Sequence, residues 1–212
     1  ALATNRLTGN APDSEAARQL VAESGGQIQR ASDIVRNIRS FLGYGTPSFQ
    51  ESDLNTAIED LLPMAEAILQ GQGPFQLALE LSRPLSPLPF DAILLQEAVL
   101  NMVRNAAEAM AGADNAGKTI TIRTEPAPDA VDIAVVDQGP GLSETQKADL
   151  VQPFRTTKPE GMGLGLAVCQ SVAEMHDGLL WAAEPRDAGG GAEIRLRLSR
   201  GSGQRANTKG NP

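Results

Sequence analysis

The sequence is short of cysteine and of aromatic residues, and each shortage excludes a class of structure. Cys169 is the single cysteine among 212 residues, so intramolecular disulfides are excluded and a reducing compartment is favoured. Five Phe, one Trp and one Tyr leave the hydrophobic core to Leu, Val, Ile, Ala and Met. With 41% hydrophobic residues, the chain can still bury the core of one medium-sized domain with an appendage.

Basic residues and long apolar runs are also scarce. Eighteen Lys and Arg against 26 Asp and Glu give a formal net charge of -8, which argues against a nucleic-acid partner because nucleic-acid-binding domains are usually basic. No apolar run approaches the ~18 residues that span a bilayer, and the N-terminus lacks a basic region followed by an apolar one. We therefore expect a cytoplasmic chain that reaches a membrane only through segments missing upstream.

The N-terminal part of the chain has the pattern of a helical hairpin. Residues 14–42 carry apolar side chains at intervals of three and four, which is typical of a long amphipathic helix, and Gly9 and Pro12 separate it from a short helical stub. Such a helix cannot cover its own apolar stripe, so we expect a homodimer that packs these helices into a four-helix bundle. Residues 43–52, with Gly43, Gly45 and Pro47, are expected to link these helices to a globular domain.

The rest of the chain alternates between helix and strand patterns. Helices are expected over residues 54–69 with a bend at Pro63, over 94–110 after a cap at Asp91, and over 166–176. Strands are expected over residues 76–81, 120–124, 131–136, 179–183 and 192–198, with 83–89 and 125–129 as connections. Helices on one face of a mixed, mostly antiparallel sheet make a two-layer α/β sandwich, an α+β fold.

Three polar residues share one face of the helix expected over residues 94–110. Glu97, Asn101 and Asn105 are spaced four apart, and apolar residues occupy the other side. Taken alone, such a ridge is more often a solvated face. Two carboxamides one turn apart, followed by two glycine clusters, favour a binding site instead.

The first glycine cluster follows an apolar strand that ends in an acid. Asp137 closes the segment AVVD, where an unpaired carboxylate is costly to bury, so we expect a donor to meet it; no other donor stands out in DQGPG. The alternative is an aspartate that only forms the turn. Gly139 and Gly141 come next, and glycine lets a backbone approach a ligand closely. A polar loop and a second cluster, Gly161, Gly163 and Gly165, complete the pattern of a nucleotide site.

In this order, the motifs NMVRNAAEAM, DQGPG, PFRTTK and GMGLGL resemble the N, G1, F and G2 boxes of the ATP-binding domain of sensor histidine kinases. That domain belongs to the superfamily shared with gyrase, the heat-shock chaperone ATPase and MutL. The resemblance covers residues 49–198, and the short lid with TTK is most similar to the nitrogen- and oxygen-sensing kinases. It implies a protein-histidine kinase that binds ATP and Mg²⁺, transfers the γ-phosphoryl to a histidine and serves a response regulator.

The resemblance also implies a role for each matching residue. Asp137 would accept the adenine amine, with Gly139 and Gly141 letting the backbone pass close to the base. Asn105 would be the metal ligand, because Mg²⁺ beside a triphosphate needs few protein oxygens. Asn101 stands where the ATP-hydrolysing branches have a glutamate base, and an amide cannot take a proton, which favours transfer over hydrolysis.

The lid and the second glycine cluster are expected to hold the phosphates. Lys158 offers a charge, Thr156 and Thr157 offer hydroxyls, and Arg104 either contacts a phosphate or is an exposed helical arginine. The expected backbone contacts, beside a helix N-terminus, are Gly161, Met162, Gly163, Leu164, Gly165 and Leu166. The expected catalytic residues are Asn101, Asn105 and Lys158, and the role of Glu108 stays open.

The chain departs from the family at the phosphoacceptor. Residues 30–42 resemble the second helix of the dimerisation and phosphotransfer hairpin, yet no histidine precedes His176, which fits a structural role. Residues 1–45 are therefore interpreted as a partial hairpin, 46–200 as the ATP-binding catalytic domain and 201–212 as a flexible tail. We favour a chain cut after the acceptor, unable to phosphorylate itself; the alternative is a nucleotide-binding pseudokinase that signals by dimerisation. An ATP-hydrolysing chaperone or mismatch-repair relative is least favoured.

Overall fold

The computed structural model describes residues 47–111, 117–150, 152, 165–185 and 191–201. The chain divides into two compact units, Ala1–Tyr44 and Gly45–Pro212, and all the described residues belong to the second. The helical hairpin expected before residue 45 and the tail expected after Gly201 lie outside the described residues.

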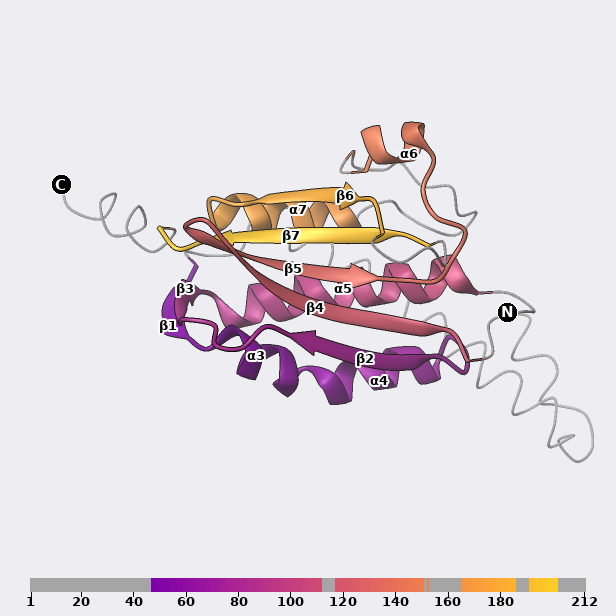
Figure 1. Ribbon diagram of the computed structural model, residues 1–212, viewed down its shortest axis with the longest axis horizontal. Helices are drawn as coiled ribbons and strands as arrows, with labels where there is room; N and C mark the ends of the chain where they lie inside the picture. Colours follow the sequence, from indigo (N-terminus) through magenta and orange to yellow (C-terminus); the bar gives the residue numbers. More distant parts are fainter. Residues whose placement is uncertain (1–46, 112–116, 151, 153–164, 186–190, 202–212) are drawn as a thin grey trace, which may run out of the picture. The chain divides into compact units, whose positions relative to one another are not determined.

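The second unit is built on a five-stranded sheet with the strand order β2-β4-β5-β7-β6 (Figure 1). These strands are β2 (Gln76–Leu81), β4 (Thr119–Ala127), β5 (Ala130–Val136), β6 (Leu179–Ala183) and β7 (Glu193–Ser199). β2 pairs in parallel with β4, and the other neighbours pair antiparallel. The sheet is therefore mixed and mostly antiparallel, as predicted. A separate antiparallel pair joins β1 (Gln50–Ser52) to β3 (Leu88–Phe90).

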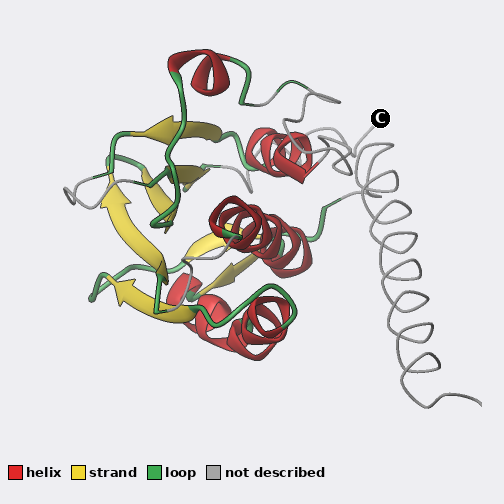
Figure 2. Cartoon of the chain, turned by 90° about the vertical axis from the view of Figure 1, so that its right-hand side faces the viewer, coloured by secondary structure: helices red, strands yellow, loops and turns green. Residues whose placement is uncertain are grey.

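Helices cover one face of the sheet and make the second layer (Figure 2). They are α3 (Leu54–Asp60), α4 (Leu62–Gln70), α5 (Ala92–Met110) and α7 (Gly165–Met175), while the short α6 (Glu144–Ala148) stands apart beyond β5. Alternate strand residues such as Ile122, Ile133 and Leu196 are fully buried against these helices. The two-layer α/β sandwich is confirmed.

Four local predictions need correction. Pro63 splits the first helix rather than bending it, because it sits in the first turn of a new helix, where its missing N–H is tolerated. The predicted connection 125–129 is mostly strand: Pro126 pairs with Val131, and Asp129 turns the chain with φ 51°. Residues 50–52 and 88–89, expected as linker and connection, belong to β1 and β3. A helix capped by Ser143 replaces part of the predicted polar loop.

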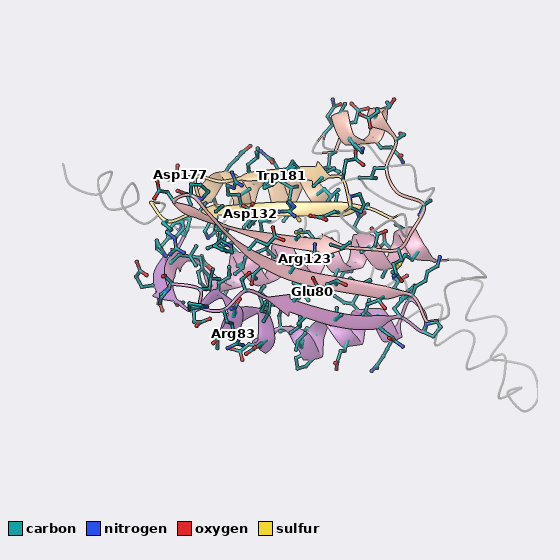
Figure 3. The ribbon with its side chains drawn as sticks, in the orientation of Figure 1. Glu80, Arg83, Arg123, Asp132, Asp177 and Trp181 are labelled. Atoms are coloured by element: carbon teal, nitrogen blue, oxygen red, sulfur yellow. The ribbon has the colours of Figure 1, made fainter. Side chains whose placement is uncertain are left out.

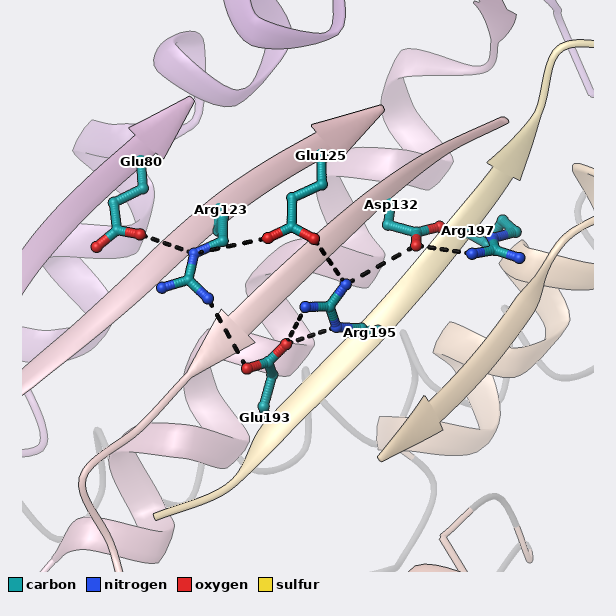
Figure 4. Close-up of polar contacts among 7 residues, drawn as sticks. All are labelled: Glu80, Arg123, Glu125, Asp132, Glu193, Arg195 and Arg197. Carbon is teal, nitrogen blue, oxygen red and sulfur yellow. Dashed lines mark hydrogen bonds and ion pairs between the residues drawn. The ribbon is translucent and has the colours of Figure 1, made fainter. Parts of the chain in front are cut away.

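The face of the sheet opposite the helices carries a ladder of charged side chains (Figure 3). Arg123 on β4 pairs with Glu80 on β2 at 2.7 Å, and Arg195 on β7 pairs with Glu125 on β4 at 2.9 Å. Asp132 on β5 binds Arg197 on β7 through both carboxylate oxygens, at 2.6 and 2.8 Å (Figure 4). The ladder joins four strands and gives the uncovered face a paired, polar surface.

Glu193 lies at the buried centre of this ladder. Its side chain is fully buried, accepts from Arg195 and lies 3.8 Å from Arg123 Nη1. Arg197 also packs over the Trp181 ring, with its guanidinium carbon 5.1 Å from the ring centroid. The ion pairs offset the cost of burying these charges, although Arg123 Nη1 and Glu193 Oε2 make no hydrogen bond within the described residues.

Candidate functional site

The C-terminal ends of β5 and α5 meet at one edge of the molecule. The backbone N–H of Gln138 donates to Met110 Sδ at 3.3 Å, directly after β5 and at the last residue of α5. A helix rises about 1.5 Å per residue, so Asn105 lies about 7.5 Å along the axis from Met110. Of the polar ridge formed by Glu97, Asn101 and Asn105, the end that carries Asn105 therefore lies toward the end of β5. Figure 1 shows both element ends on the same side.

α7 runs antiparallel to α5 and presents its N-terminus to this same edge. Cys169 Sγ contacts the Ala98 carbonyl at 3.3 Å, while His176, just after α7, contacts the Asp91 N–H at the start of α5 at 3.1 Å. Gly165, four residues before Cys169, is thus placed toward the Asn101 side of α5. The positive end of the α7 dipole faces this region.

Asp137 is buried at the strand end, with 4% of its surface exposed. Its Oδ1 accepts hydrogen bonds from the Gly139 N–H at 2.8 Å and from the Ala192 N–H at 3.1 Å. The expectation that DQGPG offers no other donor is wrong, because the Gly139 amide lies within the motif. The Gly139 contact is the turn-forming interaction considered as the alternative, and the Ala192 contact adds a second, long-range anchor. The two amide donors together hold one oxygen of the carboxylate in place.

Two glycines of the first cluster are required by the local geometry. A Cβ on Gly139 would lie 2.9 Å from Asp137 Oδ1 and 3.4 Å from Met110 Cγ. Gly141 has φ +79°, a conformation that L side chains rarely adopt. At Gly165, by contrast, a Cβ would meet no atom of the described residues within 4 Å. Packing therefore explains the first cluster, whereas the space beside Gly165 leaves room for a ligand near the backbone.

Asn101, Arg104, Asn105 and Glu108 are all partly exposed on α5. Asn101 Nδ2 is itself buried and, within the part of the chain that the structure describes, has no hydrogen-bond partner. A buried donor without a partner costs about 1–3 kcal/mol, so natural proteins rarely keep one without a reason. The observation fits a side chain that completes its hydrogen bonding on a ligand.

The structure does not test every predicted site residue. Thr156, Thr157, Lys158, Gly161, Met162, Gly163 and Leu164 lie outside the described residues. Gly165 and Leu166 form the first turn of α7. Sequence reasoning missed Gly191 and Ala192, which reach Asp137 across the molecule. The GGG run at 189–191 was the available signal, but it was interpreted only as a turn between strands.

The described residues lack two kinds of feature. They contain no group of three or more His, Cys, Asp or Glu side chains arranged to hold a metal ion. A cation bound there would rest on oxygens of another kind, such as the Asn105 carboxamide and ligand phosphates. Among the same residues, every helix is too short or too polar to cross a membrane.

Known sensor proteins are similar to this chain in sequence. The C4-dicarboxylate transport sensor protein DctS of Rhodobacter capsulatus is 35% identical over 181 residues, which cover 85% of this chain and 27% of DctS. The sensor protein FixL of Bradyrhizobium diazoefficiens is 33% identical over 189 residues, which cover 89% of this chain and 36% of FixL. The chain thus spans about a quarter of the length of DctS and little more than a third of the length of FixL.

A solved structure and a family model agree with these relatives. The nucleotide-free catalytic domain of the histidine kinase ThkA superposes with a TM-score of 0.62 and 27% identity, covering 72% of this chain and 96% of that domain. Residues 90–202, more than half of the chain, match the model of the histidine kinase-, DNA gyrase B- and HSP90-like ATPases. The resemblance that the four motifs carry is confirmed, and the chain belongs to this ATPase family.

Proposed function

We propose that this chain is the catalytic part of a two-component sensor histidine kinase. It binds ATP with Mg²⁺ and transfers the γ-phosphoryl to a histidine that this sequence does not contain, for relay to a response regulator. The observation that supports this most is the meeting, at one edge of the sheet, of the buried Asp137, the carboxamide ridge of α5 and the N-terminus of α7.

Asp137 is proposed to select the base. An ionised carboxylate only accepts hydrogen bonds, so it matches the exocyclic amine of adenine and opposes the carbonyl oxygen that guanine carries at the same position. Gly139 has no side chain to crowd Asp137, and Gly141 allows the backbone to turn with a positive φ beside it. The Asp137 site therefore favours ATP over GTP.

The N-terminus of α7 is proposed to hold the phosphates. α7 is an 11-residue helix, and its first N–H groups and dipole favour an anion. No described residue crowds Gly165, so phosphate oxygens can approach its backbone closely as far as those residues are concerned. Lys158, Thr156, Thr157 and the backbone of residues 161–166 remain the proposed lid and loop contacts.

Asn105 is the proposed protein ligand of Mg²⁺, which supplies neutralisation of phosphate charge when bound. Asn101, one turn earlier, orients the phosphates or their water through an amide that has no partner among the described residues, but it cannot act as a base. The pair therefore favours phosphoryl transfer, which depends on positioning and charge rather than on a base that activates water. His176 is fully buried with both ring nitrogens engaged, which is unsuitable for a phosphoacceptor.

The partners and boundaries follow from the same proposal. Residues 1–45 would pair two copies of the chain, 46–200 would carry catalysis, and a response-regulator receiver domain would take the phosphoryl at an aspartate. A pseudokinase that signals without phosphotransfer is not favoured, because the relatives are themselves named as sensor kinases and sensor proteins. Cytoplasmic location stays a prediction.

The test supplies the missing acceptor in trans. The 212-residue chain is incubated with Mg²⁺ and γ-labelled ATP, with and without a helical hairpin that carries an acceptor histidine. We expect label on the hairpin and none on the chain itself. Binding of ATP with no transfer to any histidine-bearing hairpin contradicts the kinase proposal.

A matched pair of variants ties that activity to the site. Asp137→Asn removes the buried negative charge and is expected to lower ATP affinity by about tenfold or more, since hydrogen bonds to charged groups contribute about 1.5–3 kcal/mol. Asp177→Asn makes the same chemical change at an exposed residue after the far end of α7. Its φ of 48° is one that asparagine tolerates, so binding should not change.

A further inference from the structure

Gly191 occupies a backbone position that no other residue fits. Its φ is +103°, and a Cβ built on it would lie 1.8 Å from the Asp137 carbonyl oxygen and 2.7 Å from the Asp137 carbonyl carbon. Real Cβ atoms essentially never come within 3.0 Å of another heavy atom, so any side chain here forces the backbone apart. The strand end that carries Asp137 and the residue before β7 are in direct contact.

This contact brings two hydrogen bonds into place. Asp137 N–H donates to the Ala192 carbonyl at 2.9 Å, and the Ala192 N–H donates to Asp137 Oδ1 at 3.1 Å. The Gly139 N–H donates to the same Oδ1 at 2.8 Å. Gly191 also bounds the far side of the turn, because its carbonyl oxygen would lie 3.0 Å from a Cβ on Gly141. One glycine thus touches the carboxylate residue and the turn that follows it.

We propose that Gly191 is a positioning residue that sets base selectivity by fixing the Asp137 carboxylate. The inference rests on the proposed function, since it assumes that Asp137 reads the base. With Oδ1 held by two backbone amides, those of Gly139 and Ala192, the carboxylate cannot rotate about its side-chain bonds without breaking a hydrogen bond. A hydrogen-bond acceptor that is fixed in place binds a base with an amino group at the facing position more tightly than a base with a carbonyl oxygen there.

The variant Gly191→Ala tests this role. The added methyl must move the Asp137 carbonyl, which separates the Ala192 N–H from Oδ1. We expect ATP affinity to fall about tenfold or more. GTP affinity should change little, so the ratio of ATP affinity to GTP affinity should fall. A purely structural glycine would lower both affinities together or lower only the melting temperature.

Gly178→Ala is the matched control. A Cβ on Gly178 would lie 1.8 Å from the Arg197 carbonyl oxygen, the same distance as at Gly191, but Gly178 follows the C-terminal end of α7, away from Asp137. Both variants are compared at a temperature where melting shows each to be folded. Gly178→Ala should keep the ATP-to-GTP preference. An equal change in both variants overturns the proposal.

A double-variant cycle asks whether Gly191 acts through Asp137. Gly191→Ala added to Asp137→Asn should cost no further ATP affinity, because the carboxylate that it positions is already gone. Additive losses overturn the inference. If the wild-type chain binds no ATP, the proposed function fails instead, so the two failures are distinguishable.

A measurement on the wild-type chain keeps the test independent of variant stability. The backbone amide NMR signals of Gly139 and Ala192 report on the two donors to Oδ1. Both should shift when ATP binds and respond much less to GTP at equal concentration. An Ala192 signal that ignores ATP while the Gly139 signal shifts would overturn the proposal.

Discussion

His176 Nε2 accepts a hydrogen bond from the Asp91 backbone N–H at 3.1 Å, and Asp91 at the same time caps α5. The Asp91 carboxylate accepts from the N–H groups of Ile93 and Leu94 at 3.0 and 3.1 Å. His176 Nδ1 lies 2.7 Å from the Val172 carbonyl, so the proton of the neutral ring belongs on Nδ1. One buried imidazole thus joins the end of α7 to the start of α5.

This arrangement predicts a pH dependence of stability. Burial lowers the pKa of His176 below its ordinary value of 6.5, with the Val172 hydrogen bond acting in the opposite direction. The folded state therefore holds the ring neutral while the unfolded chain takes up a proton. The contribution is fully present above pH 6.5 and is lost as pH falls from there through the folded-state pKa.

The measurement is the free energy of unfolding from urea titrations between about pH 8 and pH 5. His176 is the chain's one histidine, so His176→Gln should flatten the curve between about pH 5.5 and 7, above the range where carboxylates titrate. A wild-type curve already flat over that interval contradicts the prediction.

The charged ladder predicts a large cost for removing one buried arginine. Arg195 is 8% exposed and pairs with Glu125 and with the fully buried Glu193. Arg195→Met leaves Glu193 without its main partner, and breaking a buried pair in this way costs about 3–5 kcal/mol. We expect a loss of that size in urea unfolding.

Arg83→Met is the control for this loss. Arg83 pairs with Glu59 at 2.5 Å, but the two side chains are 66% and 44% exposed, so the expected cost is below about 1 kcal/mol. Removing both buried partners, with Glu193→Leu added to Arg195→Met, should recover part of the stability. Equal losses for Arg195→Met and Arg83→Met would show that the ladder is not a buried network.

Asn101 predicts opposite effects on stability and on function. Because Asn101 Nδ2 is buried without a partner in the described part of the chain, Asn101→Leu, of similar volume, removes an unsatisfied donor. We expect unfolding free energy to stay equal or rise by about 1 kcal/mol, while phosphotransfer to a histidine in trans falls. A clear loss of stability with transfer intact would assign Asn101 to the core alone.

Cys169 is predicted to be unreactive in the folded chain. Burial first and the nearby Glu97 second raise the pKa of the thiol, so little thiolate forms near neutral pH. A thiol reagent at pH 8 should label Cys169 only as fast as the chain opens, and labelling should become rapid in urea. Fast labelling under native conditions would contradict the burial of Cys169 between α5 and α7.

The sequence by itself determined the main elements and the family. Residues 76–81, where polar and apolar side chains alternate, and residues 179–183 form strands with the predicted bounds, and α5 and α7 begin within two residues of the expected helices. Periodicity reports which side of an element is apolar, and that information is local. Spacing alone likewise placed Asn101 and Asn105 on one face.

Only the tertiary structure decided which distant residues meet. Strands as short as β1 and β3 are too short to show an alternation of polar and apolar residues. Pro126 belongs to β4 because it pairs with Val131 on β5, a pairing that local sequence does not reveal. Gly191 contacts Asp137, 54 positions earlier in the chain, and nothing in the GGG run itself indicates that contact. Local pattern encodes the preference of a segment, whereas a close contact between two segments depends on their packing, which sequence spacing does not record.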